Sequence, residues 1–241
     1  MEQLEVINID TKIGGRQHDL LNTGTVQAVL ELIDAPNCAC VVMGPFCSPY
    51  CALRFDQPGP PPLFTLDEPD GVTLATPEMR KQIELAMEIA STVARIISHC
   101  TARNVPCLVE QPVPRNNHSA NPIPGRELHS TLWETSPMAE VWYRCRMWLF
   151  EFDMGAFGAR TQKTTELRVN NVAARVTHML FSGRHCWTEP DSRQTLRSNG
   201  GCFNTTGSEQ YPSLLCRQLA RWILHHAKQL GWRRRHRAAL Q

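Results

Sequence analysis

The chain has 241 residues, of which 42% are hydrophobic and 20% are charged, and its formal net charge is +2. This length and composition predict one folded domain with appendages and exclude a chain that is disordered throughout. The total charge indicates no strongly charged partner. The stretch from Arg233 to Arg237 is nevertheless a basic tail, either a solvated end, a phosphate-contacting segment or a nuclear address.

The N-terminus has no secretory signal pattern, and no run approaches the ~20 apolar residues that a bilayer crossing needs. We therefore expect an intracellular protein of the cytoplasm or nucleus with free thiols and no membrane partner. The ten cysteines lack the paired two-residue spacing of zinc fingers, so no metal is predicted. His185, Cys186 and Cys202 are the weak alternative for a metal site.

The first half of the chain alternates between strand and helix patterns. Residues 4–10 are predicted to form a short strand that ends at Asp10, and residues 25–33 have helical spacing. Residues 38–43 are typical of a short buried strand. Residues 48–75 are rich in Pro, Gly and Asp, which favours either a functional lid or a disordered loop.

The second half continues the alternation. Thr76 and Pro77 are typical of a helix start, and Asn104 is expected to end that helix. Further strands are expected at 105–109, 148–152 and 165–169, and further helices at 136–144 and 212–230. This order predicts an α/β fold with a parallel sheet covered by helices on both faces.

We divide the chain into a core of residues 1–180, a polar insertion at 181–210, a helix at 211–232 and a basic tail at 233–241. The insertion is a possible reduced target-reading segment.

Reactive side chains follow the ends of the predicted strands, namely Asp10, Cys47, Glu110 and Asp153. Ligands of open α/β sheets bind beyond the carboxyl ends of the strands, so these side chains are expected at one rim. Each has a plainer alternative. Asp10 would cap a turn, Cys47 would be a small buried side chain, and Glu110 would pair with an arginine.

The stretch Gly44-Pro45-Phe46-Cys47 resembles the Pro-Cys signature of the cytosine-C5 DNA methyltransferases, and Glu110-Gln111-Pro112 resembles their Glu-Asn motif. "DMGAFGARTQKTTEL" (153–167) is similar to their tract with an aromatic-Gly pair followed by Gln and basic residues. "STLWETSP" and "EQYPSLLCRQLARWI" are similar to a divergent, retroelement-type group of this family.

The resemblance implies a Rossmann-like sheet, S-adenosylmethionine as cofactor and DNA as partner. It implies that Cys47 attacks C6 of cytosine and that Glu110 holds the base. Asp10 would hold the ribose of the cofactor, with Asp19 and Leu20 at the adenine. Pro45, Gln162, Lys163 and Arg168 would contact the base or DNA.

The chain departs from the family pattern in several places. Only nine residues precede Asp10, so the first strand and the Gly-rich loop are expected to be missing. The sheet would then have an unpaired edge. Two arginines that the family places after Gln162 are replaced by Thr164 and Glu166. We expect a truncated copy, a degenerate relative, or a fold that an upstream domain or additional chain completes.

Two alternatives stay open. Ser48-Pro49-Tyr50 approximates the turn of an amino-methylating DNA methyltransferase but lacks one proline. In the second alternative, the chain is a non-catalytic nucleic-acid-binding module of a mobile element.

Overall fold

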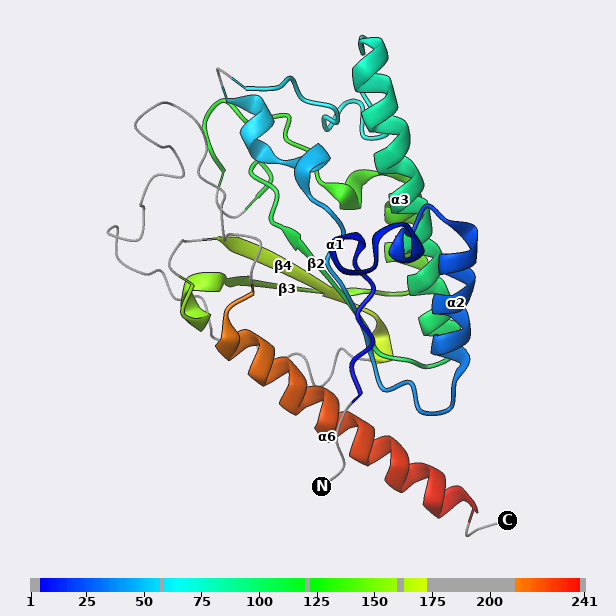
Figure 1. Ribbon diagram of the computed structural model, residues 1–241. Helices are drawn as coiled ribbons and strands as arrows, with labels where there is room; N and C mark the ends of the chain where they lie inside the picture. Colours follow the sequence, from blue (N-terminus) through cyan, green and yellow to red (C-terminus); the bar gives the residue numbers. More distant parts are fainter. Residues whose placement is uncertain (1–4, 57–58, 120–121, 160–162, 173–210, 239–241) are drawn as a thin grey trace.

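The computed structural model describes residues 5–56, 59–119, 122–159, 163–172 and 211–238, with the side chains of the last segment described up to residue 228. Its centre is a four-stranded sheet with the order β1-β2-β4-β3 (Figure 1). The strands are β1 (Val41–Met43), β2 (Cys107–Pro112), β3 (Trp148–Asp153) and β4 (Thr164–Val169). The chain therefore has a mixed α/β fold, as the alternation of patterns predicted.

The prediction of a wholly parallel sheet is wrong. β1 and β2 are parallel, but β4 runs antiparallel to both β2 and β3. Only residues 154–163 connect β3 to β4, which is too short for the crossover that a parallel pair requires. The reversal brings the start of β4 to the edge where β1, β2 and β3 end.

Helices cover both faces of the sheet, as expected. α2 (Thr23–Asp34), α3 (Pro77–Ala102) and α4 (Ser136–Arg144) pack on one face, and α6 (Ser213–Ala238) lies along the other. The remaining short helices are α1 (Thr11–Gly14), η1 (Gly15–His18), η2 (Ser48–Tyr50), η3 (Ala52–Phe55), η4 (Leu132–Glu134) and η5 (Met154–Phe157). None of the described helices combines the length and the apolar character that spanning a membrane requires.

The predicted bounds of α3 are confirmed at both ends. The Thr76 side chain accepts a hydrogen bond from the Met79 backbone N–H at 3.3 Å, and Pro77 occupies the first helical position. Asn104 follows the helix in a left-handed conformation with φ of 55°, which asparagine tolerates. The helix buries the apolar stripe that its spacing indicated, including Ala86, Ala90 and Ile97.

The predicted strand at residues 4–10 is wrong over residues 5–10, which form no strand. Val6 and Ile7 are 80% and 57% exposed, because no neighbouring strand covers them. Among the described strands, β1 is the end of the sheet. Its middle residue, Val42, is 46% exposed, so the prediction of a buried strand at 38–43 also needs correction.

The loop at residues 48–75 is packed rather than disordered in its described part. Tyr50, Leu63 and Phe64 are buried, and the Tyr50 and Phe64 rings lie 4.6 Å apart between centroids. The Arg54 guanidinium donates to the carbonyl oxygens of Ser48 and Pro61 at 2.9 and 3.0 Å. These anchors leave the described loop little freedom to close over a substrate.

Candidate functional site

Cys47 lies just beyond β1, on a turn that is tied to the next strand. The Gln111 side-chain amide donates a 2.6 Å hydrogen bond to the Pro45 carbonyl oxygen. The Cys47 carbonyl oxygen then accepts from the Tyr50 N–H at 3.0 Å, which begins η2. Cys47 is half-buried at this point. The prediction that Cys47 follows the end of a strand therefore agrees with the local structure.

Glu110 is held from two sides. It is 8% exposed on β2 and points to the face that carries α6, since its carboxylate meets Tyr211 immediately before that helix. The Tyr211 hydroxyl donates to Oε2 at 2.9 Å, and Lys163 Nζ lies 3.4 Å from Oε1. Lys163 reaches Glu110 because antiparallel β4 starts at the edge where β2 ends.

These groups act on Cys47 electrostatically. Burial raises the pKa of the Cys47 thiol. The positive charge of Lys163 lowers this pKa in part, whereas Cys51 and the negative charge of Glu110 raise it. Cys47, Glu110, Lys163 and Tyr211 therefore form one cluster, which we call the thiol–carboxyl cluster.

Gly44 allows Tyr211 to approach the end of β1. A side-chain carbon at position 44 would lie 2.5 Å from the Tyr211 hydroxyl and 3.8 Å from Glu110 Oε2. Burial, and then the charge of Glu110 and the hydrogen bond to it, raise the pKa of Tyr211. The phenol thus stays protonated and donates to the carboxylate. Sequence analysis did not find Tyr211, because it lies 101 positions from Glu110 with no spacing that links the two.

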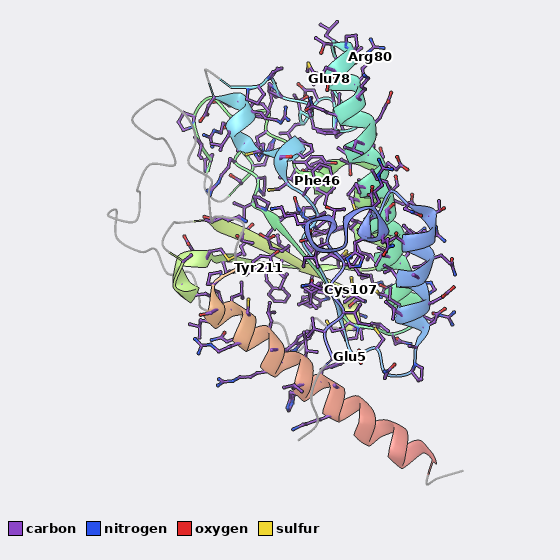
Figure 2. The ribbon with its side chains drawn as sticks, viewed as in Figure 1. Glu5, Phe46, Glu78, Arg80, Cys107 and Tyr211 are labelled. Atoms are coloured by element: carbon purple, nitrogen blue, oxygen red, sulfur yellow. The ribbon has the colours of Figure 1, made fainter. Side chains whose placement is uncertain are left out.

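Exposed aromatic rings border the thiol–carboxyl cluster. Phe46 precedes Cys47 and is 40% exposed, and Tyr211 is 38% exposed (Figure 2). Aromatic rings at a surface offer a platform on which nucleobases stack.

The residues predicted to bind S-adenosylmethionine make local backbone contacts and core packing in this structure. The exposed Asp10 caps α1 by accepting from the Lys12 N–H at 2.7 Å, so the turn-capping alternative describes it. Asp19 accepts from the Leu21 N–H at 3.0 Å, and Leu20 is partly buried against the core. Both carboxylates thus serve their own backbone, and no strand precedes Asp10 in the described residues.

The four residues predicted to contact the base or DNA are scattered. Lys163 belongs to the thiol–carboxyl cluster, Pro45 lies on the turn before Cys47 and accepts from Gln111, and Gln162 lies outside the described residues. Arg168 lies on the opposite face of the sheet. It is 9% exposed there, and its guanidinium carbon lies 4.3 and 3.7 Å from the ring centroids of Trp133 and Trp142.

The weak metal alternative, His185, Cys186 and Cys202, also lies outside the described residues. Within the described part of the chain, no three His, Cys, Asp or Glu side chains are arranged to hold a metal ion. The described cysteines are free thiols.

The turn Ser48-Pro49-Tyr50, which resembles the turn of an amino-methylating enzyme, does not expose its aromatic ring to a nucleobase. Tyr50 is 5% exposed, packs against Phe64 and donates from its hydroxyl to the Ala86 carbonyl oxygen at 3.3 Å. Its ring is therefore occupied by the core.

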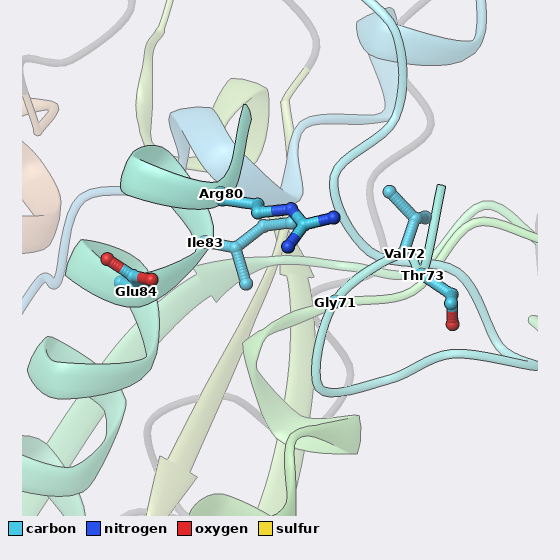
Figure 3. Close-up of a pocket in the computed structure, with 6 residues that line it drawn as sticks. All are labelled: Gly71, Val72, Thr73, Arg80, Ile83 and Glu84. Atoms are coloured by element: carbon cyan, nitrogen blue, oxygen red, sulfur yellow. The ribbon is translucent and has the colours of Figure 1, made fainter. Parts of the chain in front are cut away.

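A shallow cavity of about 240 Å³ lies elsewhere, between the loop at Gly71–Thr73 and α3 (Figure 3). Arg80, Ile83 and Glu84 line its helical side. None of the predicted site residues lines this cavity.

The comparisons with known proteins found no relative. No protein-family model, no curated protein and no solved structure matches the chain.

Proposed function

We propose that the chain is a methyltransferase-like protein that engages cytosine in DNA through Cys47 and Glu110. The observation that carries this proposal is the thiol–carboxyl cluster, in which Cys47 lies beyond the end of β1 and Glu110 lies in the C-terminal half of β2. A thiol and a carboxyl group in one cluster can contact opposite sides of one cytosine ring. The mixed sheet is consistent with a Rossmann-like fold, although other α/β folds share these features.

The proposed chemistry starts at the sulfur. The Cys47 thiolate adds to C6 of a cytosine that has left the duplex, and the new S–C6 bond moves an electron pair toward C5. Glu110 is placed to hold the N3 side of the ring while charge develops there. C5 then takes a proton from water. Loss of the original C5 proton and of the thiolate restores cytosine.

Lys163 has two roles in this scheme. Its charge favours the Cys47 thiolate, which burial alone disfavours. It also lies 3.4 Å from the Glu110 carboxylate and limits the repulsion between two neighbouring anions. We propose no methyl transfer from S-adenosylmethionine by the described residues, because Asp10 and Asp19 are occupied by their own backbone.

The exchange of hydrogen at cytosine C5 tests this proposal without a methyl donor. The full chain is incubated with a cytosine-containing oligonucleotide in deuterated water, and deuterium at C5 is measured by mass spectrometry. We expect exchange with the natural chain, exchange at background with Cys47→Ser, and a loss of about 10²- to 10⁴-fold with Glu110→Gln. Cys51→Ser is the matched control and should keep the activity. Exchange that survives in Cys47→Ser would contradict the proposal.

A non-catalytic nucleic-acid-binding module is the second candidate. The raised pKa of Cys47 favours it, because a buried thiol that stays protonated at neutral pH is a poor nucleophile. Binding of DNA by the natural chain, with C5 exchange at background for the natural chain and both variants, would favour this second candidate.

A further inference from the structure

Positive charge is concentrated on α6. This helix carries seven Lys and Arg residues and no Asp or Glu between Ser213 and Ala238. Removing these seven from the 25 Lys and Arg of the chain leaves 18 against 23 Asp and Glu. The chain outside α6 thus has a formal net charge of −5, and its near-neutral total hides a strongly basic helix.

The described cations of α6 form a stripe. Arg217, Arg221 and Lys228 are exposed. At about 100° per residue they lie within about 40° of one another around the helix axis, and they span roughly 16 Å along it. Arg217 Nε donates to the Ser213 carbonyl oxygen of the same helix at 3.3 Å. The salt bridges between described residues join groups outside α6.

The other side of α6 is already covered. Leu215 and Trp222 are 2% and 3% exposed and pack with Phe150 and Leu167 of the sheet. A basic helix that binds a membrane surface inserts an apolar face into the lipid. Leu215 and Trp222 of α6 already pack against the sheet, so these side chains are not available for insertion into lipid.

The end of α6 is free of the sheet. Figure 1 shows α6 lying across one face of the sheet, with its C-terminal turns extending beyond the rest of the described chain. These turns contain Arg233-Arg234-Arg235-His236-Arg237 in a helix that continues to Ala238. Residues 233–238 of the expected basic tail are thus part of the helix.

We infer that α6 is a docking surface for the phosphate backbone of nucleic acid. A straight row of exposed cations without interspersed acids complements a row of phosphates, and such contacts set affinity and position rather than sequence preference. The inference does not rest on the chemistry of Cys47. α6 would bind whether or not the thiol–carboxyl cluster is active.

The salt dependence of binding tests the stripe. Fluorescence anisotropy of labelled duplex DNA and duplex RNA of arbitrary sequence is measured from low to physiological salt, with the full chain and with Arg217→Gln/Arg221→Gln/Lys228→Gln. Each duplex phosphate contact contributes about 0.9 to the slope of log affinity against log salt. For DNA, the triple variant should therefore show a slope about 2.7 less steep.

Matched variants separate charge from damage to the fold. Arg16→Gln/Lys81→Gln/Arg95→Gln removes the same charge from exposed positions elsewhere and should keep the natural slope. Arg217→Lys/Arg221→Lys keeps the charge on α6 and should keep binding. Cys47→Ser should also bind normally, which separates this inference from the proposed function.

Two results would overturn the inference. One is an equal salt slope for the natural chain and the α6 triple variant with both duplexes. The other is a triple variant that loses binding to phosphatidylserine vesicles while binding both duplexes as the natural chain does.

Discussion

The buried pair Glu166 and Arg168 sets a pH dependence of stability at the level of single residues. The two side chains lie on β4 with a 3.3 Å contact between Arg168 Nη2 and Glu166 Oε2. Burial raises the pKa of Glu166 to about 8, and the attraction of Arg168 only partly opposes this. Glu166 Oε1 and Arg168 Nε have no hydrogen-bond partner in the structure.

The sign of the effect follows from proton uptake. A carboxyl group whose pKa is higher in the folded chain binds its proton more tightly there than in the unfolded chain. Its contribution to stability is complete below its ordinary pKa of about 4.5 and is lost as the pH rises through about 8. The free energy of unfolding should fall across this window by at most about 1.4 kcal/mol per pH unit.

Glu166→Gln should flatten this dependence. Urea unfolding of the full chain at pH 5.5, 7 and 8.5 measures it, with the exposed Glu88→Gln as the control that keeps the natural slope. A natural chain whose stability rises with pH over this range, or a Glu166→Gln chain with an unchanged slope, would contradict the raised pKa.

The positions of single site residues were predictable where the sequence of strands and loops along the chain determines them. Cys47 and Glu110 were predicted as site residues because Cys47 follows one short strand and Glu110 lies on the next. These two strands are parallel, so their carboxyl ends meet at one edge of the sheet. Arg168 was placed at the site because of its sequence neighbours, but side chains alternate between faces along β4. Its position therefore puts it between Trp133 and Trp142 instead.

Among the elements, the loop at 48–75 differs most from its prediction as a lid or a disordered loop. Phe64 is 2% exposed and packs against Tyr50. Phe64→Ala should destabilise the chain by about 3–5 kcal/mol, because the lost ring leaves a cavity in the core. Leu74→Ala, at a position 95% exposed in the same loop, should change stability by less than about 0.5 kcal/mol.

Thermal and urea unfolding of both variants measure this difference. Equal, small effects of the two substitutions would show that the loop is not packed as described, and would restore the possibility of a lid.

Helix periods and capping residues predicted α2, α3 and α4 well, because these signals are local. The direction of β4 was not predictable from its own residues, since a short segment such as Thr164–Val169 fits a parallel and an antiparallel strand equally well. The strand expected at 4–10 failed for a related reason. Its alternating pattern fits a sheet, but the described chain provides no partner for it.

At the scale of the molecule, the distribution of charge and the edges of the sheet determine which partners the chain can bind. The total charge of +2 suggested no charged partner, and only the helical arrangement shows that the cations gather on α6. Among the described strands, β1 and β3 form the two edges of the sheet. Whether another chain pairs with either edge was beyond sequence reasoning, because pairing depends on a partner.

The central claim is that Cys47, Glu110 and Lys163 share one cluster beyond the end of β1 and beside the C-terminal half of β2. The most direct test is the pKa of the Cys47 thiol in the full chain, measured from the pH dependence of its alkylation by iodoacetamide with peptide mass spectrometry. Lys163→Met should raise this pKa, because a nearby positive charge is lost, and Glu110→Gln should lower it, because a nearby negative charge is lost. Lys81→Met, at an exposed position of α3, should leave it unchanged. Equal pKa values in the natural chain and all three variants would contradict the claim.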